Sequence, residues 1–362
     1  MDYTMEDNTS LWINATLAEH IHGVYFTIKW IQVITATLSI LGPGSIIGYA
    51  VFQNVVKSAE VRPLFYLSLS DLLLAACWLI GAVLYRRSCQ HDVACYNLQA
   101  VGQMFYISTF FHTLNYTWQN FSIMRRRLDS ELYKMSEKKC CFGRITTVLS
   151  SAVPFLFTLP TLSIGNSHHC YENSSHSCLV LNVGSQITTD PERYTDTVCN
   201  GLHLYSTGVY LATFCLTVIP ILVIAACSQT VVQRHLATTA GFIQDQQWAV
   251  IKVMSWRLLI FPAIFFLCCL PAVILTVLKL ADYKGTNALY IFLYCIQAIT
   301  AVSPGFINCL AYGWTQHVLR SLKQKGCRDV DTQTPLLRSQ KKLYASMHTS
   351  STDFRPNTVS AL

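Results

Sequence analysis

Residues 63–85 read Pro-Leu-Phe-Tyr-Leu-Ser-Leu-Ser-Asp-Leu-Leu-Leu-Ala-Ala-Cys-Trp-Leu-Ile-Gly-Ala-Val-Leu-Tyr, and their single charge is Asp71. The run is long enough to cross the hydrocarbon core of a bilayer, which takes about 20 mostly apolar residues in a helix. An ionisable group inside a membrane helix costs about 2.5–3.5 kcal/mol on insertion scales, so we expect Asp71 to face protein rather than lipid. A lone acid in such a helix is therefore a candidate functional residue.

The composition of the whole chain indicates a membrane protein. Hydrophobic residues make up 52% of the sequence and charged residues only 12%, whereas soluble proteins are about 25% charged. Seven long apolar segments account for the difference and lie near 24–53, 63–85, 97–124, 145–165, 202–228, 251–278 and 288–313. Backbone groups in lipid must be hydrogen-bonded internally, and these runs do not alternate as barrel strands would. We therefore predict an all-α membrane protein, a bundle of seven transmembrane helices over residues 24–313.

The distribution of charge predicts the orientation of this bundle. Lysine and arginine outnumber acidic residues in the segments on one side, which include Arg125, Arg126 and Arg127, and acidic residues are in excess on the other side. The positive-inside rule then places residues 1–23 outside the cell. Those residues lack the basic start of a cleavable signal peptide, so we expect the first helix to be its own insertion signal. Three sequons fall in segments placed outside and are predicted glycosylation sites, namely Asn8, Asn14 and Asn173.

The end of the chain differs in composition from the bundle. Residues 314–326 place Trp314, Val318 and Leu322 on one face of a helix with basic residues elsewhere, which predicts a short amphipathic eighth helix at the membrane surface. The tail, residues 327–362, is polar and is predicted to be a disordered cytoplasmic segment.

Four stretches in order resemble G-protein-coupled receptors, and they are more similar to the branch of slime-mould cyclic-AMP receptors than to the rhodopsin-like branch. These stretches are Leu38–Gly48, Phe65–Leu73, Arg257–Pro271 and Gly305–Gly313, within a similarity that covers about residues 30–325. Three rhodopsin-like motifs are altered: Gln119-Asn120-Phe121 stands where Asp-Arg-Tyr is expected, Cys269 replaces the kink tryptophan, and Ser303-Pro304-Gly-Phe-Ile replaces Asn-Pro-x-x-Tyr.

The resemblance implies roles for individual residues. It implies that Asp71 faces the bundle core and takes part in ion binding and activation, with Thr109 and either Ser303 or Asn308 as its neighbours; structural bonding between helices is the simpler alternative. It implies hinges at Pro220, Pro271 and Pro304, with Cys269 in the kink segment. It also implies that Arg125, Arg126 and Arg127 contact a G protein, although membrane anchoring and attraction to anionic lipid explain the same basic cluster.

The cysteines of the outer segments are placed in an oxidising compartment. By the resemblance, Cys95 opens the third helix and bridges to the second outer loop, to Cys178 or alternatively to Cys170. The set His168-His169-Cys170 with His176 and Cys178 has residue types that bind zinc. We expect fortuitous histidines in a glycosylated loop rather than a metal site.

These observations favour a receptor of the plasma membrane that passes the signal of an unknown extracellular ligand to a heterotrimeric G protein and modulates adenylate cyclase. The coupling and the cyclase are implied by the resemblance alone. A non-signalling seven-helix scaffold is one alternative, and a transporter or channel subunit is another, disfavoured because Asp71 is the one secure buried charge expected in the spans. We expect contact with membrane lipid, no enzymatic activity, no cofactor and no nucleic-acid partner.

Overall fold

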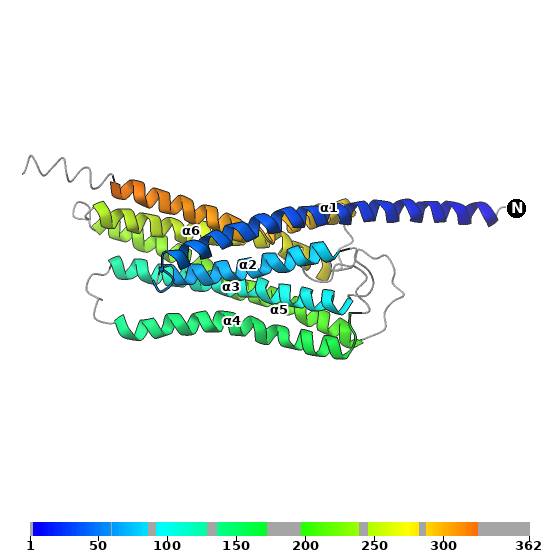
Figure 1. Ribbon diagram of the computed structural model, residues 1–362, viewed down its shortest axis with the longest axis horizontal. Coiled ribbons are helices and arrows are strands. Elements are labelled where there is room, and N and C mark those ends of the chain that lie inside the picture. The colour runs from blue at the N-terminus through cyan, green and yellow to red at the C-terminus, as the bar shows by residue number, and fades with distance from the viewer. Residues whose placement is uncertain are drawn as a thin grey trace, which may run out of the picture.

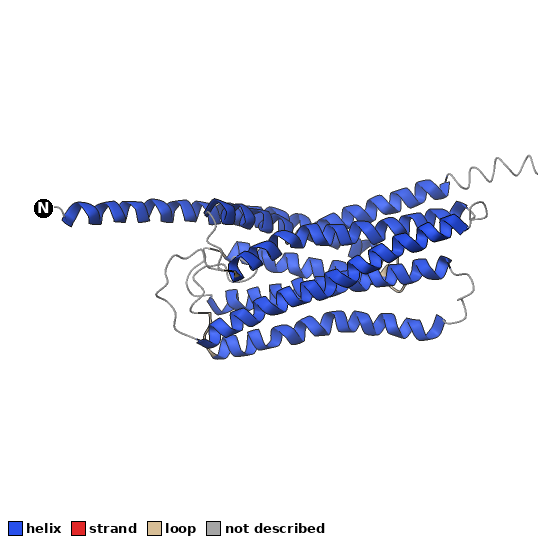
Figure 2. Ribbon diagram, turned by 180° about the vertical axis from the view of Figure 1, so that it is seen from behind, coloured by secondary structure: helices blue, strands red, loops and turns tan. Residues whose placement is uncertain are grey.

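The structure is a computed structural model that describes residues 3–58, 60–85, 92–128, 136–171, 197–238, 245–281 and 287–324. Throughout this part of the chain the regular structure is helical (Figure 2). The helices are α1 (Tyr3–Phe52), α2 (Arg62–Leu84), α3 (Asp92–Leu128), α4 (Ser136–Ser167), α5 (Thr197–Thr238), α6 (Asp245–Leu280), α7 (Asn287–Thr300) and a further helix, Pro304–Gln324. The prediction of an all-α membrane fold is confirmed.

The helices run side by side and alternate in direction, so that the bundle has two ends (Figure 1). We call one the Arg127 end; it holds the turn 53–61 and the last residues of α3 and of Pro304–Gln324. We call the other the Cys170 end, where α4 finishes and α5 begins. An ion pair between Arg127 and Glu60 joins α3 to the turn at the first of these ends.

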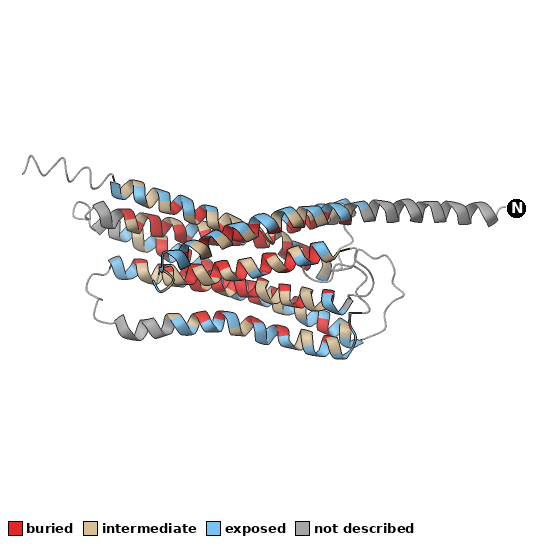
Figure 3. Ribbon diagram, in the orientation of Figure 1, coloured by how far each residue is buried: buried red, intermediate tan, exposed pale blue. Residues whose placement is uncertain are grey.

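The outer surface of the bundle is suited to lipid. Five helical stretches are long and apolar enough to cross a membrane, and the bent pair of α7 and Pro304–Gln324 meets the same criterion as one broken span. Large apolar side chains such as Leu41, Leu216 and Leu267 are about two-thirds exposed on these helices, whereas a soluble protein rarely exposes apolar patches on this scale. Figure 3 shows buried residues on the inward faces and exposed residues on the outward faces. The chain is thus a multi-pass membrane protein.

The third helix explains why a count of seven spans stays a prediction. α3 is long enough to cross a bilayer but is less apolar than the five stretches that qualify as spans. It packs against α2, α4, α5 and α6, so most of its surface faces protein. Buried polar side chains on it, such as His112, Asn115 and Asn120, make the helix polar without exposing those groups to lipid. Its composition therefore reflects its position inside the bundle.

The last described helix corrects one boundary. A separate amphipathic helix was predicted from residue 314, but residues 314–324 continue the helix that begins at Pro304. Contacts with α6 explain this continuity: the Trp314 ring stacks on Trp256 with 5.2 Å between centroids, and Thr315 accepts a hydrogen bond from Arg257. Residues 314–324 therefore form the end of the second half of the broken span rather than a separate helix. The predicted tail, 327–362, lies outside the described residues.

The predicted outer N-terminus also differs from a simple extension. α1 is helical from Tyr3, and its apolar part is Gly23–Phe52, close to the predicted first span. Asn8 and Asn14 lie on the part of α1 whose side chains the structure does not describe, and Asn173 lies outside the described residues. Glycosylation at these three asparagines stays a prediction.

Candidate functional site

Asp71 lies in the interior of the bundle, where two other helices supply its hydrogen-bond partners. Its side chain is 3% exposed. The Thr109 hydroxyl on α3 donates to Oδ1 at 3.3 Å, and the Asn308 amide on Pro304–Gln324 donates to Oδ2 at 3.2 Å. One carboxyl group therefore connects α2, α3 and the last described helix.

The electrostatics of this site are unusual for a buried acid. Both donors are neutral, and within the described residues no lysine or arginine forms an ion pair with Asp71. Hydrogen bonds to a carboxylate favour its charged form, whereas burial without a counter-ion disfavours that form. A buried acid without an ion-pair partner inside a membrane helix is a candidate functional group.

The seventh span is interrupted beside Asp71. α7 ends at Thr300, residues 301–303 form a turn, and the next helix starts at Pro304 with a bend of 48°. Proline suits this position because the first turn of a helix leaves its N–H groups without intrahelical partners. The Ser303 hydroxyl donates to the carbonyl of Ile299. The Ser303 hydroxyl is therefore bonded to the backbone of α7. The structure brings Thr109 and Asn308, but not Ser303, to the carboxyl of Asp71.

A seam of small residues on α1 closes this interruption. The Thr35 hydroxyl lies 2.8 Å from the carbonyl oxygen of Ile31 in its own helix and 3.3 Å from that of Ala298 across the seam. The Ser39 hydroxyl donates to the carbonyl of Val302. Such bonds satisfy backbone groups at a helix break, which in lipid have no water to bond. We refer to Thr35, Ser39 and Gly42 as the α1 seam. These three residues are spaced four and three positions apart, which places them on one face of α1. This spacing could have indicated a helix contact, but the seam was not predicted from the sequence.

Two glycines allow the helices of the seam to approach closely. A Cβ atom on Gly42 would lie 2.8 Å from the Phe306 Cα, and one on Gly305 would lie 2.6 Å from the Pro43 Cγ and 3.1 Å from the Asp71 Cβ. Real Cβ atoms do not make contacts of 2.6–2.8 Å. Glycine at these positions therefore sets the distance between α1, the last described helix and Asp71.

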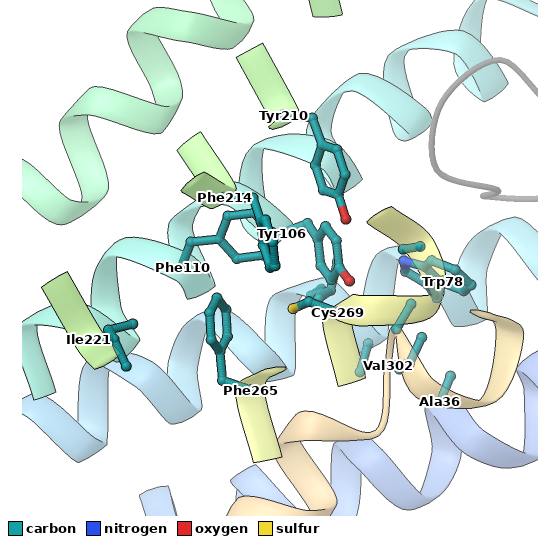
Figure 4. Close-up of a cluster of buried hydrophobic side chains, with 14 residues drawn as sticks. Ala36, Trp78, Tyr106, Phe110, Tyr210, Phe214, Ile221, Phe265, Cys269 and Val302 are labelled. Atoms are coloured by element: carbon teal, nitrogen blue, oxygen red, sulfur yellow. The ribbon is translucent and has the colours of Figure 1, made fainter. Parts of the chain in front are cut away.

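A cluster of aromatic side chains fills the bundle on the side of α3 and α5 (Figure 4). Phe110 is fully buried and contacts Tyr210, Phe214 and Phe265, with ring centroids 5.3–5.9 Å apart. Cys269 is buried in the same cluster, which places the residue that replaces the kink tryptophan against the aromatic core.

The predicted hinge prolines behave differently from one another. Pro220 lies inside α5 and Pro271 inside α6, and both helices continue through them. Pro304 alone of the three follows a break. A hinge at the described break is thus compatible with the backbone, whereas motion at Pro220 and Pro271 stays a prediction.

A second buried charge was overlooked in the sequence. Arg257 on α6 is 6% exposed; its Nε donates to the Thr315 hydroxyl at 3.1 Å, and its guanidinium lies 5.0 Å from the ring centre of Tyr312. The expectation that Asp71 is the one secure buried charge of the spans is therefore wrong. The signal was an arginine inside the apolar run 251–278, whose other charge, Lys252, lies at the start of the run.

The three predicted coupling arginines lie at the end of α3. Arg125, Arg126 and Arg127 are exposed in its last turn. Arg127 forms the ion pair with Glu60. The Arg127 end therefore presents basic side chains to its surroundings, and their contact with a G protein stays a prediction.

The disulfides connect segments at the Cys170 end. Cys170 is bonded to Cys199, with 5.5 Å between their Cα atoms. The alternative partner predicted for Cys95 is therefore excluded, because that cysteine is already bonded. Cys95 is itself disulfide-bonded, and its predicted partner Cys178 lies outside the described residues.

The zinc-type residues near Cys170 gain no support from the described part of the chain. The Cys170 sulfur is in a disulfide and is not a free thiolate ligand. Within the described residues no three histidine, cysteine or acidic side chains gather as metal ligands.

Together, the lipid-facing surface, the buried carboxyl and the interrupted span define a multi-pass helical membrane protein with a polar core. A comparison with protein families identifies the group more closely. The sequence model of the family Transmembrane protein 116 matches residues 25–346. The chain therefore belongs to the transmembrane protein 116 family, and the match covers nearly the whole of the bundle predicted from the sequence.

Proposed function

We propose that this protein is a receptor of the plasma membrane that transmits the signal of an extracellular ligand to a heterotrimeric G protein, with adenylate cyclase as the regulated target. The observation that carries the proposal is the bonding of Asp71 to Thr109 and Asn308 beside an interrupted helix. The resemblance to cyclic-AMP-like receptors supplies the G protein and the cyclase. The proposal assigns no catalytic reaction to the chain.

In the proposed mechanism this polar core acts as a two-state element. A change in the angle between α7 and Pro304–Gln324 would separate Asn308 from the carboxylate and alter the cost of burying its charge. The same helix carries Tyr312 and Thr315, which contact Arg257 near the Arg127 end. A movement at Asp71 would thus reach the end of the bundle where Arg125, Arg126 and Arg127 are exposed.

The proposal is tested with a panel of G-protein subtypes co-expressed with the full chain, reading dissociation of the G-protein subunits. Replacing Asp71 with asparagine is expected to change basal or evoked activation at least threefold while surface expression persists. Replacing Arg125, Arg126 and Arg127 together with alanine is expected to reduce activation.

Two threonines on α3 provide a matched pair for this assay. Thr109 and Thr113 are both buried and lie one helical turn apart, and each hydroxyl is within hydrogen-bond distance of the backbone carbonyl four residues earlier. The Thr109 hydroxyl also reaches Asp71, at 3.3 Å. Thr109→Val is expected to shift activation in the same direction as Asp71→Asn, and Thr113→Val to leave it unchanged. Normal expression with unchanged activation in Asp71→Asn would remove Asp71 from the mechanism. Silence with every subtype would favour the scaffold alternative.

Transport is the second candidate function, because ion-coupled transporters also place interrupted helices beside buried acids. In those proteins the carbonyls freed at the break are available to the ion. Here the carbonyl of Val302 accepts a hydrogen bond from Ser39, and the carbonyl of Ala298 lies 3.3 Å from the Thr35 hydroxyl, which disfavours that role. Uptake of a labelled cation by vesicles containing the protein, abolished by Asp71→Asn, would favour transport over signalling.

A further inference from the structure

A groove on the outside of the bundle has properties that the proposed function does not use. It is a cavity of about 570 Å³ lined by α2, α3 and α4. α2 and α4 both pack against α3, which forms the floor of the groove between them. The volume lies in the range of small-molecule sites, about 300–1,000 Å³.

The groove opens toward the lipid. Its rim includes Leu73 on α2 and Val148 and Phe155 on α4, which are 38%, 66% and 50% exposed. Both helices are apolar enough to span a membrane. A ligand for this groove would therefore arrive from the bilayer rather than from water.

The floor of the groove is polar at a depth where lipid supplies no hydrogen bonds. His112 on α3 is 2% exposed, and its Nε2 lies 3.2 Å from the Ser151 hydroxyl, while its Nδ1 has no hydrogen-bond partner in the described part of the chain. The Ser70 and Ser108 hydroxyls lie 3.4 Å apart on the same floor. Buried polar groups without partners are costly in an apolar medium, and each calls for an explanation.

Polar and apolar lining residues are separated along the groove. Toward the Arg127 end, Tyr66 stacks on His112 and Thr147 lies on α4. Away from that end the lining is apolar and includes Leu73, Phe105 and Phe155. Ser151, which lies beside His112, is eight residues past Gly143, where the apolar stretch of α4 begins, so the polar part of the groove is about 12 Å along the helix from that edge. The lining therefore matches a rigid apolar body with one small polar group at the end that lies toward the Arg127 end of the bundle.

We propose that this groove binds a sterol, with the sterol hydroxyl at His112 and Ser151 and the ring system between α2 and α4. The chemistry of the lining selects this class of lipid: no Lys, Arg, Asp or Glu of the described residues lines the cavity, so a phosphate or ammonium headgroup would find no partner. A single hydroxyl can both donate to an imidazole nitrogen and accept from a serine. The aromatic walls provide flat contacts for fused rings.

The sterol would lie against the polar core. Ser70 and Ser108, on the groove floor, are the sequence neighbours of Asp71 and Thr109. The contact of Ser70 with Ser108 and the bond of Thr109 to Asp71 therefore connect α2 and α3 at the same level. An occupant that spreads α2 and α3 would therefore lengthen the bond from Thr109 to Asp71. Binding itself does not depend on the proposed function, because it is measured without any signalling.

The experiment uses the full chain in nanodiscs with a cholesterol analogue that carries a photoreactive diazirine, and mass spectrometry locates the labelled peptides. Labels are expected on residues 62–85 and 143–167, and competition by cholesterol is expected to exceed competition by its 3α-hydroxyl epimer. His112→Phe keeps a ring against Tyr66 but removes both nitrogens. It should weaken competition by cholesterol about fivefold, the worth of one hydrogen bond, and remove the preference between epimers.

A second pair of variants distinguishes binding in the groove from binding elsewhere on the lipid-facing surface. Ala152→Trp fills the groove from α4 and should reduce labelling of these peptides at least tenfold. Ala226→Trp places the same side chain on the exposed face of α5 and should leave labelling unchanged. Unchanged labelling in Ala152→Trp, or equal competition by a phosphatidylcholine, would overturn the proposal; the latter would assign the groove to an acyl chain. Thermal unfolding of each variant verifies that it is folded.

Discussion

α3 and α4 are neighbouring helices of comparable length, yet their surroundings differ. α3 packs against four helices and buries both aromatic and polar side chains, whereas α4 packs against α3 and α5 and turns residues such as Val148 and Leu156 outward. α4 is apolar enough to qualify as a span by composition and α3 is not. This difference shows that the hydropathy of a helix in a bundle depends on how much of its surface faces lipid. A central helix can cross the membrane with a polar sequence, because its neighbours supply the hydrogen bonds.

The largest effect is expected from truncating one aromatic side chain on each of these helices. Phe110 on α3 is fully buried, and Phe157 on α4 is 36% exposed. Phe110→Ala should lower the free energy of unfolding by about 3–5 kcal/mol, because it leaves a cavity in the aromatic cluster. Phe157→Ala should cost less than about 1 kcal/mol, since lipid can fill the space. Unfolding of the purified protein by a denaturing detergent measures both, and equal losses would show that α4 is not lipid-facing.

A smaller loss of stability is expected when a single methyl group is added at the seam. This test extends the comparison of inner and outer surfaces to other helices. Gly305→Ala places a Cβ 2.6 Å from Pro43 and should destabilise the protein by about 1–3 kcal/mol, the usual cost of overpacking. A Cβ atom on Gly208 of α5 would meet nothing within 4 Å, so Gly208→Ala should be neutral or slightly stabilising. Thermal denaturation compares the two, and a neutral Gly305→Ala would show that α1 is free to move away from Pro304–Gln324.

The smallest of the three effects is expected when α3 and α4 are removed from the bundle. As isolated segments in a microsomal insertion assay with engineered flanking glycosylation sites, residues 143–167 should insert in most chains and residues 97–124 in a minority. The ratios of inserted to non-inserted chains should differ about tenfold, equivalent to about 1.4 kcal/mol. Replacing His112, Asn115 and Asn120 with leucine should restore insertion of α3. Efficient insertion of the unmodified α3 segment would contradict the comparison.

Part of the candidate site could be predicted from the sequence because it depends on single residues in long apolar runs. Asp71 was singled out in this way, and the structure places it in the interior of the bundle. The same rule would have found Arg257, had it been applied to the run 251–278. Thr109 and Asn308 came from the resemblance rather than from the pattern of residues.

Other features depend on how the helices cross, and no local pattern specifies that. The resemblance offered Ser303 as a neighbour of Asp71. Its hydroxyl instead donates to the carbonyl of Ile299, because the turn after α7 directs it back along that helix. The bond of Cys170 to Cys199 excluded one of two candidate partners for Cys95, a choice that spacing left open. Residues of the α1 seam contact carbonyls more than 260 positions away.

The sequence by itself determined that this protein is a helical membrane protein with an acid inside its bundle. The physical reason is that apolar length and the cost of a charge in lipid act on each segment independently. The tertiary structure alone decided which partners the acid has, that α7 is interrupted beside it, that a polar α3 occupies the centre, and that a groove opens between α2 and α4. These features follow from distances between helices, which small residues such as Gly42 and Gly305 set once the helices have packed.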